Sequence, residues 1–171
     1  MQTLPAAFSS DGGMTYNTFF FNSDYTSVTD IGVASHSYPN RALYGGLSDP
    51  RPGSVATDQA CTQLKSYWFG CILSAGDPRA ALPVTCTVKL EGFDKAGTST
   101  GTQSFTFTPD SSTTSNMNKA TITTIGKSKV IRFSTFAAGG TEESSSTIVT
   151  LLDDVSYVQY SNTSDCGAGS W

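Results

Sequence analysis

The sequence has few charged residues and no excess of positive charge. Asp, Glu, Lys and Arg make up 14% of its 171 residues, against about a quarter in an ordinary soluble domain. The net charge of -4 and the pI of about 4.7 exclude the basic surface with which proteins bind nucleic acids or anionic membranes. We therefore expect neither nucleic acid nor a membrane as a partner.

Histidine is also scarce, and this argues against several kinds of chemistry. The chain contains a single histidine, His36, and no Gly-x-Ser-x-Gly segment accompanies it, so a Ser-His-acid triad is not indicated. We expect this loop histidine simply to be exposed to solvent. We expect no catalytic residues, and the less favoured alternative is a small glycan-active enzyme that uses Glu91.

Long hydrophobic runs are missing as well. No segment approaches the length of a transmembrane helix, and the first residues lack the basic and apolar regions of a signal peptide. If the protein is secreted, we expect the sequence to be a mature form that carries an added initiator Met. No charge run or Pro-rich linker divides the chain, which predicts a single domain over residues 1–171.

Four cysteines are present, and they fit two disulfides, with three possible pairings. We favour Cys71 with Cys86, because they lie in apparent neighbouring strands joined by a short loop. Cys61 would then pair with Cys166 and tie down the polar tail over residues 161–171. A zinc site is disfavoured because the cysteine spacings are not C-x₂-C. The alternative to two disulfides is that the cysteines are reduced core thiols of a cytosolic protein.

The polar tail also contains an N-glycosylation sequon. It consists of Asn162, Thr163 and Ser164. This tripeptide occurs often by chance, but it agrees with secretion. Disulfides, few charges and the sequon together predict an extracellular protein.

Apolar and polar residues alternate in short runs that are bounded by turn-forming residues. This pattern predicts an all-β fold, an antiparallel β-sandwich or jelly roll. The clearest case is the segment in which Val88 and Leu90 share one face while Lys89 and Glu91 take the other. The predicted strands are 67–73, 84–90, 102–108, 120–125, 129–136 and 147–160. Residues 15–22 are interpreted as a strand or an aromatic loop, 27–33 as a further candidate strand and 35–52 as a long connection.

Two adjacent carboxylates, Asp153 and Asp154, interrupt the last predicted strand. An ionised carboxylate inside a core strand needs a cation, an Arg or a bend in the chain to satisfy it. We expect this pair to bind a structural Ca²⁺, whose ligands are oxygens. The alternative is that both residues flank a strand bend in solvent.

The long connection holds the residue types that recognise sugars. Tyr38 and Tyr44 offer flat rings that can stack on a pyranose, and Asn40 and Arg41 offer hydrogen-bonding groups. These four are the predicted ligand-binding residues. The alternative is that both tyrosines cap the edge of the sandwich.

Four short segments occur in a recognisable order. They are Tyr16 to Phe21, Ser37 to Asn40, Val88 to Phe93 and Leu152 to Val155. In this layout the chain resembles the jelly-roll domains of secreted fungal proteins, which are similar to calcium-containing carbohydrate-binding modules. The resemblance implies a non-catalytic domain whose partner is a polysaccharide or other glycan, with a calcium ion at the last strand. The alternative is a secreted surface or effector-like domain that binds a cell-surface protein.

Overall fold

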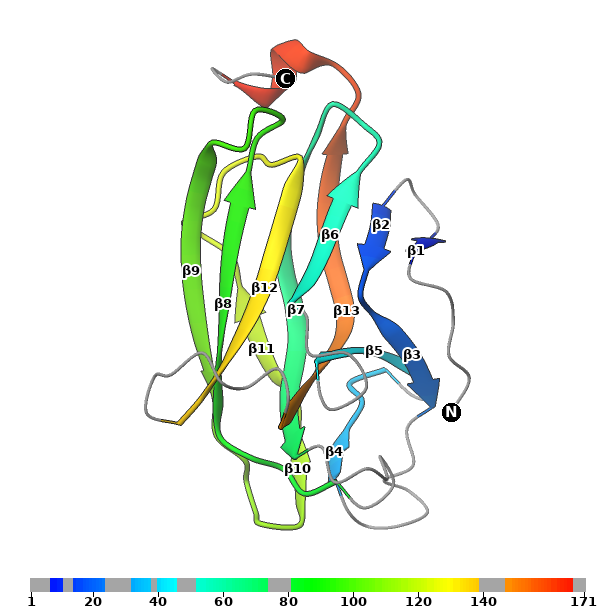
Figure 1. Ribbon diagram of the computed structural model, residues 1–171, viewed down its shortest axis with the longest axis vertical. Coiled ribbons are helices and arrows are strands. Elements are labelled where there is room, and N and C mark those ends of the chain that lie inside the picture. The colour runs from blue at the N-terminus through cyan, green and yellow to red at the C-terminus, as the bar shows by residue number, and fades with distance from the viewer. Residues whose placement is uncertain are drawn as a thin grey trace.

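The computed structural model describes residues 7–10, 14–23, 32–37, 40–45, 52–73, 81–138 and 147–167. Two antiparallel sheets pack face to face (Figure 1). The six-stranded sheet contains, in spatial order, β1 (Ala7–Ser10), β2 (Met14–Asn17), β6 (Gly53–Thr57), β12 (Val130–Ala137), β8 (Cys86–Phe93) and β9 (Ser99–Phe107). The five-stranded sheet contains β11 (Asn118–Thr121), β7 (Cys61–Leu73), β13 (Ile148–Tyr160), β5 (Asn40–Gly45) and β3 (Phe20–Ser23). The predicted antiparallel β-sandwich is confirmed.

Two short elements complete the fold. β4 (Gly32–Ala34) and β10 (Thr114–Asn116) form a small parallel pair apart from both sheets. The chain ends in a 3-10 turn, η2 (Thr163–Cys166). None of the described residues forms a helix long and apolar enough to cross a membrane.

The alternation seen in the sequence becomes the two faces of each strand. Along β8, buried and half-buried residues alternate without a break, and the predicted strands 84–90 and 102–108 form the hairpin of β8 and β9. Its turn is closed by a hydrogen bond from the Asp94 N–H to the Thr98 carbonyl, 2.9 Å long. Gly97 takes a φ of 82° in this turn, a conformation that glycine adopts without a Cβ clash.

Aromatic rings from both sheets meet in the core. Tyr67 of β7 contacts Phe133 of β12 edge to face, with ring centroids 5.6 Å apart, and Phe69 contacts Phe107 at 6.2 Å. All four side chains are fully buried. Edge-to-face pairs of this kind add to the apolar burial that holds the two sheets together.

Both predicted disulfides are present. Cys71 joins Cys86 and so links the two sheets, while Cys61 joins Cys166 and holds the 3-10 turn against the start of β7. Two disulfides of this kind fit an extracellular protein, because thiols are kept reduced in most cytosolic compartments.

Among the first sixty residues, one prediction was wrong and another was incomplete. The expected connection over residues 35–52 contains strand β5, which pairs with both β3 and β13. The expected strand over residues 15–22 is split into β2 and β3 at Thr18, which has a φ of 63°. The Thr18 hydroxyl lies 2.6 Å from the carbonyl oxygens of both Asn17 and Pro52, which supports this unusual conformation.

Candidate functional site

The outer face of the five-stranded sheet carries the short strand β4. Gly70 of β7 permits this, because Val33 of β4 rests where the Gly70 side chain would be. A Cβ on Gly70 would lie 2.6 Å from Val33 Cγ1, and Val33 is fully buried. The contact fixes the position of β4, and with it the position of β10, which pairs with β4 in parallel.

The acidic pair lies at an irregularity of β13. The register between β13 and β7 slips between Asp153 and Ser156, and Asp154 has a φ of 44°. Asp153 lies opposite Trp68 of β7 and is 8% exposed. The predicted bend near Asp153 is therefore confirmed, and it turns both carboxylates toward the chain that follows β4.

Ser37 and His36 satisfy these carboxylates. The Ser37 N–H donates to Asp153 Oδ2 at 2.7 Å, and the Ser37 hydroxyl lies 2.8 Å from both Asp153 Oδ1 and Asp154 Oδ1. Asp154 Oδ2 lies 2.5 Å from Nδ1 of His36. The pair thus anchors residues 36 and 37 to the sheet.

The same contacts bear on the fit of a calcium ion. All four carboxylate oxygens of Asp153 and Asp154 already lie within hydrogen-bonding distance of a protein donor. Ca²⁺ takes about six to eight oxygen ligands and would have to replace these donors. In the described part of the chain no group of three or more His, Cys, Asp or Glu side chains is placed to hold a metal. Calcium stays a prediction.

His36 also stacks on Trp68. The two rings are nearly parallel, with centroids 3.7 Å apart and an interplanar angle of 12°. The hydrogen bond with His36, helped by Ser37, holds the pKa of Asp154 below its usual value of 3.8. A lowered carboxyl pKa stabilises the fold above pH 3.8, and this contribution is lost as the pH falls further. It is small, because the side chains of His36 and Asp154 are 43% and 42% exposed.

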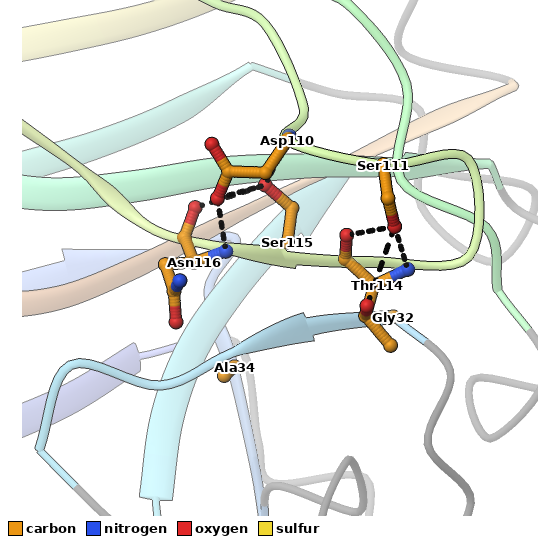
Figure 2. Close-up of a pocket in the computed structure, with 7 residues that line it drawn as sticks. All are labelled: Gly32, Ala34, Asp110, Ser111, Thr114, Ser115 and Asn116. Atoms are coloured by element: carbon orange, nitrogen blue, oxygen red, sulfur yellow. Dashed lines mark hydrogen bonds between the residues drawn. The ribbon is translucent and has the colours of Figure 1, made fainter.

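A polar pocket of about 270 Å³ lies beside β4 (Figure 2). It lies between β4 and the segment that leads into β10. Its lining residues are Gly32, Ala34, Asp110, Ser111, Thr114, Ser115 and Asn116. Most are small, and five of them carry hydroxyl, amide or carboxylate groups.

Hydrogen bonds within the lining hold the pocket wall in shape. The Asp110 N–H donates to the Ser115 hydroxyl at 3.0 Å, and the Asn116 N–H donates to Asp110 Oδ2 at 3.2 Å. The Ser111 hydroxyl donates to the Thr114 carbonyl at 2.6 Å. These bonds leave the second carboxylate oxygen of Asp110 and the side-chain amide of Asn116 without a partner among the residues drawn in Figure 2.

The pocket and the aromatic stack are connected by the chain that leaves β4. Ala34 lines the pocket and pairs with Asn116, and His36 follows two residues later. His36 and Ser37 lie in a bend of the chain that follows β4. We use the name β4 site for the two groups of residues that β4 and the chain after it position: Asp110, Ser111, Thr114 and Asn116 of the pocket, with His36 and Trp68 of the stack.

The predicted sugar-binding residues are not part of the β4 site as the structure describes it. Tyr44 is 2% exposed, and its hydroxyl lies 2.9 Å from the Thr135 hydroxyl, so stacking of its ring on a sugar is a wrong prediction. Inward alternation along β5 places this ring in the core. Asn40 and Arg41 lie in β5, where only their backbone is described, and Tyr38 lies outside the described residues.

Glu91, the alternative catalytic residue, lies elsewhere. It is on the outer face of the six-stranded sheet, where its carboxylate pairs with Lys89 at 2.9 Å. Its neighbours across the strands are Arg132 and Thr102.

Two tyrosines buried in the core, Tyr44 and Tyr67, differ in whether the hydroxyl is hydrogen-bonded. Burial raises the pKa of Tyr44 to about 12, despite its bond with Thr135, and raises that of Tyr67 well above its usual value. In the part of the chain that the structure describes, the Tyr67 hydroxyl has no hydrogen-bond partner, in contrast to that of Tyr44.

We expect Tyr44→Phe to lower the free energy of unfolding by about 1 kcal/mol, because it removes a buried bond. Tyr67→Phe removes no bond and should leave stability unchanged or raise it. Urea unfolding of both variants measures this difference, and equal losses would contradict the assignment.

Comparisons with known proteins bear on the fold. No protein-family model matches the chain, and no curated protein sequence matches it either. The structure is similar to the crystal structure of a DUF4465 family protein from Bacteroides caccae. The TM-score is 0.54 at 14% identity, over 86% of this chain and 74% of that chain. A CBM4 structure aligns with a TM-score of 0.28 at 14% identity, over 90% and 78% of the two chains. The first likeness supports the β-sandwich fold alone.

Sequence reasoning missed the β4 site. Its signal was the run from Asp110 to Asn116, which is wholly polar and follows the end of a strand. Such loop segments often bind ligands, because a rigid strand holds them in place.

Proposed function

We propose that this protein is a non-catalytic carbohydrate-binding domain of a secreted protein and that its sugar site is the β4 site. The observation that carries the proposal is a polar pocket beside β4, with the His36–Trp68 stack formed by the chain that follows the same strand. The fungal origin and the calcium ion implied by the sequence resemblance are finer parts of the same proposal.

The chemistry of the site matches that of a sugar. A pyranose has hydroxyls that donate and accept hydrogen bonds, and faces of C–H groups that pack against flat rings. The second carboxylate oxygen of Asp110 can accept a hydrogen bond from a sugar hydroxyl, and the Asn116 side-chain amide can donate and accept one. The pocket adds the hydroxyls of Ser111 and Thr114. The exposed ring of His36, two residues after Ala34, and the half-buried ring of Trp68 supply aromatic surface.

Binding without bond cleavage follows from the same lining. Hydrolysis of a glycoside usually needs two carboxyl groups on opposite sides of the bond. Asp110 is the single carboxylate among the residues that line the pocket. The carboxylates of Asp153 and Asp154 do not line the pocket and are hydrogen-bonded to Ser37 and His36.

The test is retention of the purified protein on a panel of soluble and insoluble polysaccharides, with a check for released sugar. We expect Asn116→Ala to weaken binding roughly tenfold, which is the loss of about one hydrogen bond. Asn118→Ala is the matched control, because Asn118 is an exposed asparagine two residues away that does not line the pocket. No retention on any glycan, or equal losses in both variants, would contradict the proposal.

Thermal melting of the protein, with Ca²⁺ and with EDTA, tests the calcium prediction. A melting temperature that rises with Ca²⁺ and falls after Asp154→Asn would support an ion at the acidic pair. An unchanged melting temperature would show that Ser37 and His36 alone satisfy Asp153 and Asp154.

A further inference from the structure

We propose that Asn162 carries an N-linked glycan when the chain follows an oxidising secretory route. The tripeptide Asn162-Thr163-Ser164 is the one N-x-[ST] sequence in the chain. A sequon is used only if the asparagine is accessible, so the structure decides between a real acceptor and a chance match.

The fold leaves this asparagine open. Residues 161 to 165 are all exposed, and Asn162 has extended backbone angles, φ -101° and ψ 136°, just before the 3-10 turn. The fold uses the carbonyl of Asn162, which accepts the Asp165 N–H at 3.1 Å. Within the described residues the Asn162 side chain makes no capping bond to the turn, and the side chain is exposed.

The disulfides supply the second argument. Cys166 lies four residues after Asn162 and is bonded to Cys61, and a second disulfide links the two sheets. Compartments that form such bonds are also those in which secreted chains meet N-glycosylation enzymes. The same cellular route thus provides both modifications.

The reaction is a transfer of an oligosaccharide from a polyprenyl pyrophosphate donor. The Asn162 side-chain nitrogen forms a bond to the anomeric carbon, and the bond from that carbon to the pyrophosphate oxygen breaks. The polyprenyl pyrophosphate leaves with the electron pair, and one amide proton passes to a base of the transferase.

A glycan at this position would leave the β4 site accessible. Figure 1 shows the end of β13 and the 3-10 turn at the top of the molecule, whereas β4 and β10 lie at the bottom. This proposal does not depend on the proposed function, because it concerns the opposite end of the sandwich.

The test is secretion of the full chain from a eukaryotic host, followed by intact mass measurement before and after treatment with an N-glycan-releasing amidase. We expect one glycan on the wild-type chain, and peptide mass spectrometry should find Asn162 converted to Asp after release. Asn162→Gln and Ser164→Ala should each abolish the modification completely.

Thr163→Ala and Asn118→Gln are the controls and should keep the glycan, because the middle residue of the sequon is variable and Asn118 lies outside it. A co-expressed glycoprotein shows that the host pathway works. An unmodified wild-type chain beside a modified co-expressed protein would overturn the proposal, as would a glycan that survives in Ser164→Ala.

Discussion

Replacing Cys61 and Cys166 together by alanine is expected to lower the free energy of unfolding by about 5 kcal/mol. The bond between them closes a loop with a sequence separation of 105 residues. In the chain-entropy account, a cross-link over about 100 residues restricts the unfolded chain by about 4.7 kcal/mol. The polar tail has little apolar surface to hold it without this bond, and the hydrogen bond that the Lys127 ammonium donates to the Asp165 carbonyl is exposed.

The second disulfide gives the comparison. Cys71 and Cys86 are separated by 15 residues, for which the same account gives about 3 kcal/mol. Urea unfolding of the two double-alanine variants therefore should differ by about 2 kcal/mol. An equal or larger loss at the shorter loop would show that native contacts between the sheets outweigh chain entropy. Sugar binding should survive the loss of Cys61–Cys166, because that bond lies at the end of the sandwich opposite β4 (Figure 1).

The disulfides were predictable although β7 and β8 belong to different sheets. The short loop between two apparent strands indicated that Cys71 and Cys86 lie within bridging reach, and the remaining two cysteines then gave the polar tail its anchor. The β8–β9 hairpin was predictable because its signal is local, since its turn residues and its alternating pattern agree. The bend at Asp153 followed from the cost of a carboxylate in a core strand.

β5 was missed because the residues around it have no clear strand pattern in the sequence. Its strand character comes from pairing with β13, more than a hundred residues away along the chain. Tyr44 was misplaced for the same reason, because a ring inside a loop and a ring inside a strand look alike until the partner strand is known. Its contact with Thr135 spans 91 residues.

The candidate site was only partly predictable. The sequence pointed to Asp153 and Asp154, but not to His36 and Ser37 as their partners, which lie 116 to 118 residues away. His36 was expected to be simply exposed; it is exposed, yet it also stacks on Trp68. The pocket arises where β4 meets β10, and neither short strand has a pattern of its own.

A second large effect is expected at Gly70. Gly70→Ala places a methyl group 2.6 Å from Val33 Cγ1, and the β-branched Val33 has no rotamer freedom with which to move aside in a fully packed position. Either β4 lifts from the sheet or the core distorts, at a cost of about 1–3 kcal/mol. Because β4 forms one wall of the pocket, we expect sugar binding to fall together with stability.

Two variants separate this effect from a general loss of a glycine. Gly97→Ala also substitutes a glycine, but nothing lies within 4 Å of the new Cβ, and its φ of +82° predicts a loss of about 1 kcal/mol without any change in binding. Val33→Ala combined with Gly70→Ala opens room for the methyl group and should restore part of both stability and binding. Thermal melting and polysaccharide retention measured on all three variants give the answer. If the double variant binds no better than Gly70→Ala alone, contact between Val33 and Gly70 is not what holds β4 in place, and the pocket owes its shape to the hydrogen bonds of Asp110, Ser111 and Ser37.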